Sequence, residues 1–262
     1  MVADDITPAG GQTLVRALDI LDCLARENAW LSVPEISELV GLKRTTTYRL
    51  VKILASRGFL VSNAQRKFHL GGAVVRLSAV VMERNRGFVQ LAAPALERLR
   101  DQVGETVSLQ TIAAGERICV LEFVSREPIR MESGVGKLYP LYRGAAGKAL
   151  LAFQPGAFDA LVEDVKKGRP LRGFGSKTEI DLDALGAELD VIRERGYATS
   201  DSEVIAGAAA LSVPVIDGAG MVRGAVNVTG PSNRWTPQRQ LEELATIQNE
   251  VRNSVERLLG TV

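Results

Sequence analysis

Two short helical segments joined at a glycine constrain the fold of the first 60 residues most tightly. Ser32 and Glu35 stand in the Ser-x-x-Glu spacing of a capping box, with Pro34 in the first turn. The helix that they open is expected to end at Gly41, because glycine readily adopts the left-handed conformation that closes a helix. A basic helix is expected from about residue 44 to Gly58, after an earlier amphipathic helix over about 13–27. This order predicts a helix-turn-helix.

Two strand-like segments, 59–61 and 67–70, follow the basic helix and are joined by the polar residues 62–65. Their length and spacing predict a hairpin. We interpret this hairpin as the wing of a winged helix-turn-helix, with Arg66 and Lys67 near its tip.

The same region carries a segregated positive charge. No acidic residue occurs between Glu38 and Glu83, although the whole chain has a formal charge of only +1. Such a surface would bind a polyanion. In a helix-turn-helix, the first turns of the second helix, here the basic helix that begins near residue 44, enter the major groove of double-stranded DNA. The candidate DNA contacts are Lys43, Arg44, Thr45, Thr46, Thr47, Tyr48, Arg49 and Lys52 on the helix and Arg66 and Lys67 on the wing. The alternative is a small helical domain with a solvated basic face.

Composition restricts the chemistry. The chain has one histidine, His69, and two cysteines, Cys23 and Cys119, which lie far apart in apolar patterns. A His-based triad or a His/Cys zinc site is therefore not expected, and neither is a cofactor or a catalytic residue. No apolar run approaches the roughly 20 residues that span a bilayer. The N-terminus is not a basic signal sequence, so we expect a cytoplasmic protein with reduced cysteines.

The rest of the chain predicts an α/β domain. Residues 72–102 are apolar at helical spacing, with a break at 85–87. Strands are expected at 106–112, 118–124, 129–133, 211–216 and 222–229, and helices near 145–153, 156–166, 182–195 and 237–259. A hairpin is expected over 217–220. The predicted organisation is a DNA-binding domain over 1–72, a linker helix over 73–86 and an α/β domain over 87–262.

Two features of the second domain indicate a ligand pocket. The segment 144–149 looks like a phosphate-binding loop, but the position after Lys148 holds Ala149 instead of Ser or Thr. We interpret it as a helix N-terminus that could receive a carboxylate; the alternative is a tightly packed turn of small residues. Asn227 and Thr229 are two residues apart on one strand, so they point to one face. That face lines a pocket or is simply solvated.

Several short segments resemble the IclR family of transcriptional regulators: 16–21, 31–32, 41–42, 48–50, 68–71, 147–152, 214–217 and 230–231. One departure is Lys43, where the family usually has proline. The resemblance implies a GAF-like second domain that binds an effector and assembles dimers into tetramers. It also implies effector contacts at Met131, Tyr139, Ala145, Ala146, Asp201, Ala208, Ala210, Asn227 and Thr229.

These observations predict a transcription factor controlled by a small organic acid, aromatic acids included. Its carboxylate is expected at Ala145 and Ala146, with Arg130 and Arg143 near the mouth of the pocket. The residues do not encode whether the regulator represses or activates. Two alternatives are an enzyme acting on such an acid and a structural DNA binder. The carboxylates Glu105, Glu116, Glu122, Asp201 and Glu203 show no spacing that implies acid–base chemistry.

Overall fold

The computed structural model describes residues 11–84, 86–113, 115–168 and 180–256. The chain divides into two compact units, Met1–Arg86 and Gly87–Val262. Among the helices within these described ranges, none is long and apolar enough to cross a membrane.

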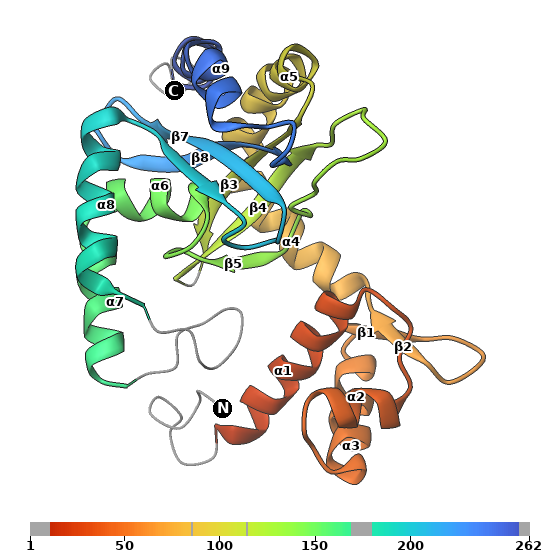
Figure 1. Cartoon of the computed structure of the whole chain (residues 1–262). Helices are drawn as coiled ribbons and strands as arrows, with labels where there is room; N and C mark the ends of the chain where they lie inside the picture. Colours follow the sequence, from red (N-terminus) through yellow and green to blue (C-terminus); the bar gives the residue numbers. More distant parts are fainter. Residues whose placement is uncertain (1–10, 85, 114, 169–179, 257–262) are drawn as a thin grey trace. The chain divides into compact units, whose positions relative to one another are not determined.

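The first unit is a winged helix-turn-helix (Figure 1). It contains α1 (Gln12–Glu27), α2 (Val33–Leu39), α3 (Arg44–Ser56), the antiparallel strands β1 (Leu60–Ser62) and β2 (Phe68–Leu70), and α4 (Gly72–Arg84). The predicted capping box at Ser32 and Glu35 is present at the start of α2. Gly41 has a φ of 67°, as the turn between α2 and α3 requires.

The core of this unit corrects the predicted buried face of α3. Its buried side chains are Ile20, Leu24, Ile36, Leu50, Val51, Leu54, Leu60 and Phe68. We expected Leu50, Ile53 and Leu54 to face the core, but Ile53 is exposed and Val51 is fully buried. The buried positions of α3 are Thr47, Leu50, Val51 and Leu54, which follow the i, i+3, i+4, i+7 spacing of one helical face. The stripe is therefore rotated from the predicted one.

The second unit begins with α5 (Arg86–Val103) and contains one antiparallel sheet in the order β5-β4-β3-β8-β7-β6. The strands are β3 (Thr106–Ala113), β4 (Glu116–Phe123), β5 (Leu138–Pro140), β6 (Ala198–Asp201), β7 (Ala208–Ile216) and β8 (Val222–Pro231). The remaining helices are α6 (Ala145–Phe153), α7 (Ala157–Lys166), α8 (Leu182–Arg195) and α9 (Pro237–Glu250), with a π-helical turn over Val251–Glu256.

Helices cover both faces of the sheet. On one face, α5 and α9 pack against valines and leucines of β3, β7 and β8, and on the other α6 and α8 pack against a second cluster that includes Ala210 and Ala225 (Figure 1). Val226 and Val228 belong to the first cluster. The intervening Asn227 therefore points to the α6 face, as the period of two along a strand requires.

Two predicted elements differ from the structure, and two strands of the structure were not predicted. Residues 129–133 form a loop, whereas β5 and β6 were not predicted. The strand that pairs with the edge of β4 is β5, at residues 116–118 of β4, instead of the earlier segment 129–133. Glu122 instead accepts hydrogen bonds from the backbone N–H groups of Ser133, at 2.6 Å, and Gly134, at 3.1 Å. The last helix was expected to run to 259; α9 ends at Glu250, and 257–259 lie outside the described residues.

Candidate nucleic-acid interface and ligand pocket

The outer face of α3 is basic and exposed. Lys43, Arg44, Thr45, Tyr48, Arg49 and Lys52 are all exposed, and Thr46 is half-buried. Lys43 is the N-cap residue but its side chain makes no capping bond, so the departure from proline leaves an exposed ammonium at the helix start. The Lys52 ammonium lies 5.8 Å from the centroid of the Tyr48 ring. These side chains present cations and hydroxyls together, which suits phosphate and base contacts.

Thr47 corrects the predicted set of DNA contacts. Its side chain is fully buried in the helix-turn-helix, and its hydroxyl donates to the backbone oxygen of Lys43 at 3.2 Å. It belongs to the core stripe of α3 rather than to the outer face. Thr47 therefore supports the helix and offers no atom to DNA in this conformation.

The wing presents one exposed cation and one paired cation. Asn63 Oδ1 accepts the N–H groups of Gln65 and Lys67, each at 3.0 Å, which shapes the tip. Arg66 is exposed there, with a φ of 57°. Lys67 lies 3.6 Å from a carboxylate oxygen of Glu35 on α2. Hydrogen bonds from Ser32 and the nearby Lys67 lower the pKa of Glu35, so folding brings an anion to a stretch that is acid-free in sequence.

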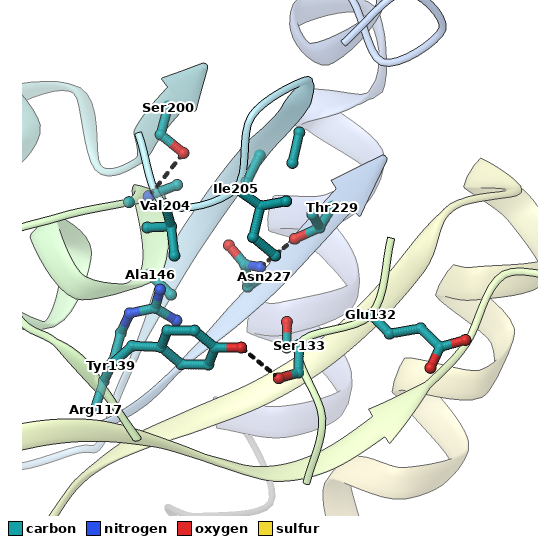
Figure 2. Close-up of a pocket in the computed structure, with 14 residues that line it drawn as sticks. Arg117, Glu132, Ser133, Tyr139, Ala146, Ser200, Val204, Ile205, Asn227 and Thr229 are labelled. Carbon is teal, nitrogen blue, oxygen red and sulfur yellow. Dashed lines mark hydrogen bonds between the residues drawn. The ribbon is translucent and has the colours of Figure 1, made fainter. Parts of the chain in front are cut away.

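A pocket opens on the α6 face of the second unit (Figure 2). The space enclosed by its lining residues measures about 450 Å³, open solvent included. Seven of the predicted effector contacts line it: Tyr139, Ala145, Ala146, Ala208, Ala210, Asn227 and Thr229. The other lining residues, which sequence reasoning missed, are Arg117, Glu132, Ser133, Gly144, Ser200, Val204 and Ile205.

Two predicted contacts, Met131 and Asp201, do not line the pocket. Ser200 pairs with Ala210, which faces the pocket, whereas Asp201 pairs with Ala209, which is buried in the opposite core. Successive residues of β6 point to opposite faces of the sheet, so the predicted contact was one residue away from the one on the pocket face. Near Met131, the pocket wall is formed by Glu132 and Ser133, the following residues.

The start of α6 is only partly available to a ligand. Gly144 has a φ of 74°, and its N–H donates to Glu203 Oε2 at 2.8 Å. The N–H of Ala145 donates to Ser200 Oγ at 3.1 Å. Among the described residues, the backbone N–H of Ala146 has no such acceptor and remains open to a ligand. Of the predicted pair, Ala146 thus keeps a donor and Ala145 does not.

The floor of the pocket is polar and buried. Arg117 donates to Gln110 Oε1, and the Gln110 amide nitrogen donates to Ser108 Oγ at 3.2 Å. Asn227 Nδ2 donates to Thr229 Oγ1 at 2.6 Å. Two atoms of this floor, Arg117 Nε and Asn227 Oδ1, have no hydrogen-bond partner among the described residues, although Arg117 and Asn227 are only 5% and 4% exposed. Unpaired buried polar atoms of this kind are rare and favour a ligand site.

Arg117 is the cation of the pocket. Its guanidinium carbon lies 4.5 Å from the centroid of the Tyr139 ring, and Tyr139 itself is fixed by its hydroxyl, which donates to Ser133 O at 2.7 Å (Figure 2). Burial lowers the pKa of Arg117 to about 10, which still leaves it charged at neutral pH. The predicted cations Arg130 and Arg143 do not line the pocket; Arg130 instead pairs with Glu132 at 3.0 Å.

A winged helix-turn-helix with a basic outer face, followed by an α/β unit with a ligand pocket, defines a transcriptional regulator of the effector-binding class. Sequence comparison makes the assignment specific. The model of the IclR helix-turn-helix domain matches residues 13–64, and that of the bacterial transcriptional regulator IclR C-terminal domain matches 82–257. The chain belongs to the IclR family, which confirms the predicted family, fold class and DNA-binding regulatory function.

Individual relatives agree with this assignment. The chain is 31% identical to the HTH-type transcriptional repressor AllR of Salmonella paratyphi A over 242 residues, covering 92% of this chain and 88% of that protein. The crystal structure of the Thermotoga maritima IclR matches with 26% identity and a TM-score of 0.67, over 95% of this chain and 99% of that one. An IclR homolog from Microbacterium hydrocarbonoxydans, complexed with 4-hydroxybenzoate, matches the fold with 22% identity and a TM-score of 0.67, over 92% and 100%.

Proposed function

We propose that this protein represses transcription and that a small organic acid, aromatic acids included, controls its affinity for operator DNA from the pocket beside α6. The observation that carries the proposal is the pair of unpartnered buried atoms, Arg117 Nε and Asn227 Oδ1, in a cavity of a DNA-binding regulator. A buried polar atom without a partner costs free energy, and a bound ligand removes that cost. An apolar ligand would leave both atoms unpaired.

Two relatives support the finer parts of this proposal. The AllR proteins are named as repressors, which supports repression as the sense of regulation. The Microbacterium homolog was crystallised with a hydroxylated aromatic acid, which supports the class of effector and supplies a first probe.

The proposed reading surface is the outer face of α3 with Arg66 of the wing. Arg44 and Arg49 are exposed and could bind phosphate or a guanine edge, while Thr45 and the half-buried Thr46 offer hydroxyls. In the cytoplasm, double-stranded DNA with two related half-sites would be bound by a dimer, since each recognition helix reads one half-site.

We therefore propose a homodimer, and a dimer of dimers as the larger assembly. Apolar side chains are exposed on two helices of the first unit: Leu14 and Leu18 on α1, and Val75 and Val80 on α4. Exposed apolar side chains in such numbers suit contact with a second copy of the chain. The segment 73–86 would then act as the linker between the DNA-binding domain over 1–72 and the effector domain over 87–262.

The test is a binding measurement with the full chain. Fluorescence anisotropy of a labelled duplex from the promoter of the protein's own gene would be recorded without and with 4-hydroxybenzoate, glycolate and glyoxylate. At least one acid should change the operator affinity, with no effect on the weak binding to a scrambled duplex. An unchanged affinity with all three acids would contradict the proposed control. Turnover of a bound acid, followed by chromatography, would instead favour an enzyme.

A further inference from the structure

We propose that Arg117 binds the carboxylate of the effector and that Asn227 receives a hydroxyl group of the same molecule, so that the effectors are hydroxy acids. This inference rests on the proposed function and specifies which ligands the pocket accepts. The sequence predicted that the start of α6 binds the carboxylate; the main anion-binding group proposed here is instead the buried Arg117.

The contacts of Arg117 leave one side of its guanidinium unused. One terminal nitrogen donates to Gln110 Oε1, and the plane lies over the Tyr139 ring. Nε has no partner, and within the described part of the chain no carboxylate forms an ion pair with this arginine. Neutral groups thus hold the guanidinium in place, and Glu203, which forms no direct ion pair with it, raises its pKa from a greater distance.

A buried cation without a direct ion pair favours an anionic ligand. Arg117 is only 5% exposed, so water screens its charge poorly. A carboxylate can accept hydrogen bonds from two guanidinium nitrogens in parallel, and such charge-assisted pairs are stronger than neutral ones. Burial lowers the pKa only to about 10, so the guanidinium still keeps its charge at neutral pH.

The start of α6 supplies a second donor to the same anion. A Cβ added to Gly144 would lie 3.2 Å from Arg117 Nη2, which places the guanidinium against the first turn of this helix. Figure 2 shows Arg117 beside Ala146, whose N–H is open. One carboxylate can therefore accept from the arginine and from the helix N-terminus together, where the helix dipole also favours a negative charge.

Asn227 sets the second requirement. Its Nδ2 donates to Thr229, and its Oδ1 is buried without a partner. If the side-chain amide were rotated by 180°, Oδ1 would accept from the Thr229 hydroxyl and Nδ2 would be left unpaired instead. A hydroxyl both donates and accepts, so it satisfies Asn227 in either orientation. Glu132 lines the pocket on the side away from Arg117, and its carboxylate points outward and pairs with Arg130 at 3.0 Å (Figure 2).

Calorimetric titration of the full chain with matched probes tests both contacts. The probes are 4-hydroxybenzoate, its neutral analogue 4-hydroxybenzamide, and benzoate, with glycolate and glycolamide as the aliphatic pair. Wild-type protein should prefer each acid to its amide, and 4-hydroxybenzoate to benzoate. R117Q should weaken the affinity for each acid by about 10- to 100-fold and change the affinity for its amide little, so that the preference for the acid disappears. N227A should abolish only the preference for the hydroxylated acid.

The controls separate recognition from folding. R126Q removes an exposed arginine that pairs with Asp101 and does not line the pocket, and it should bind every probe as wild type does. R117K keeps the charge but loses the two parallel donors, so it should retain part of the acid preference even where R117Q unfolds. Thermal unfolding of each variant shows whether it is folded.

The outcomes distinguish this inference from the function beneath it. Equal binding of an acid by wild type and a folded R117Q overturns the role of Arg117 and leaves acid control of the operator standing. Preference of wild type for the amides, or binding of neither 4-hydroxybenzoate nor glycolate at millimolar concentration, overturns hydroxy-acid binding. Acid binding that depends on Arg117 without any change in operator affinity supports the inference and contradicts the proposed control.

Discussion

Replacing Lys148 with methionine should destabilise the second unit strongly. The Lys148 side chain is only 4% exposed, and its ammonium lies 2.6 Å from one oxygen of Glu188 and 2.6 Å from one of Glu203. The methionine side chain is similar in length and keeps the apolar contacts, so the change removes mainly the charge. It deprives two carboxylates of a charge-assisted hydrogen bond, each worth about 1.5–3 kcal/mol.

Solvent reduces this loss. Glu188 and Glu203 are 41% and 31% exposed, so water can hydrate them once the ammonium is gone. Glu203 also keeps its bond from the Gly144 N–H. We therefore expect K148M to lower the free energy of unfolding by about 2–4 kcal/mol, below the sum of the two bonds. For a unit of this size, that corresponds to a fall in Tm of about 4–16 °C by scanning calorimetry.

The matched control is K167M. Lys167 lies 2.7 Å from Glu163 in an i, i+4 pair whose side chains are 54% and 57% exposed. Exposed pairs of this kind contribute about 0.3–0.5 kcal/mol, so K167M should move Tm by no more than about 2 °C. If both variants shift Tm by the same small amount, the buried Lys148 cluster does not stabilise the unit and the reasoning from burial is refuted.

Three further predictions concern DNA reading, pH and the pocket. Arg49→Ala should cost about 1–3 kcal/mol on the operator and much less on a scrambled duplex, whereas a folded Thr47→Val should bind both as wild type does; anisotropy titration checks this. Hydrogen bonds from the Met221 N–H and other donors lower the pKa of Asp217 in the folded protein. The ionised Asp217 therefore stabilises the folded state above the unfolded-state pKa of about 3.9. This stabilisation is lost as the pH falls through the pKa of the folded state. The Tm difference between wild type and Asp217→Asn should accordingly be largest at neutral pH and vanish in acid. Gly144→Ala, at a positive φ, should lower stability by at least about 1 kcal/mol and weaken acid binding, as denaturation and calorimetry would show.

Elements marked by strong local signals were predictable from the sequence. The capping box of Ser32 and Glu35, the left-handed Gly41 and the hairpin over 217–220 each depend on a few adjacent residues, and all three are present. The helix α6 was expected over 145–153 and spans Ala145–Phe153. Short-range preferences decide such features, so tertiary packing has little to change.

Predictions were wrong where the face that a residue occupies depends on the exact phase of a pattern, or where a strand depends on a distant pairing partner. Thr47 was expected on the outer face of α3 and Ile53 in the core, whereas Thr47 is buried and Ile53 is exposed. Threonine is not hydrophobic enough to indicate from the sequence that it belongs to the buried face of a helix. Asp201 was chosen where Ser200 lines the pocket, since only pairing with Ala210 fixes the phase of the four-residue strand β6. The short strand β5 has no periodicity long enough to read, and its pairing with β4 defines it.

The two buried cations of the second unit show why the anion site was misplaced. Lys148 follows a glycine-rich turn that resembles a phosphate-binding loop, yet it is neutralised by Glu188 and Glu203 and does not line the pocket. Arg117 stands in β4 without any motif, but it lines the pocket and forms no direct ion pair among the described residues. Direct ion pairs thus distinguish Lys148 from Arg117, and such pairs depend on residues far away in the sequence. An arginine directly before the apolar run 118–121 is the sequence signal that could have pointed to this site.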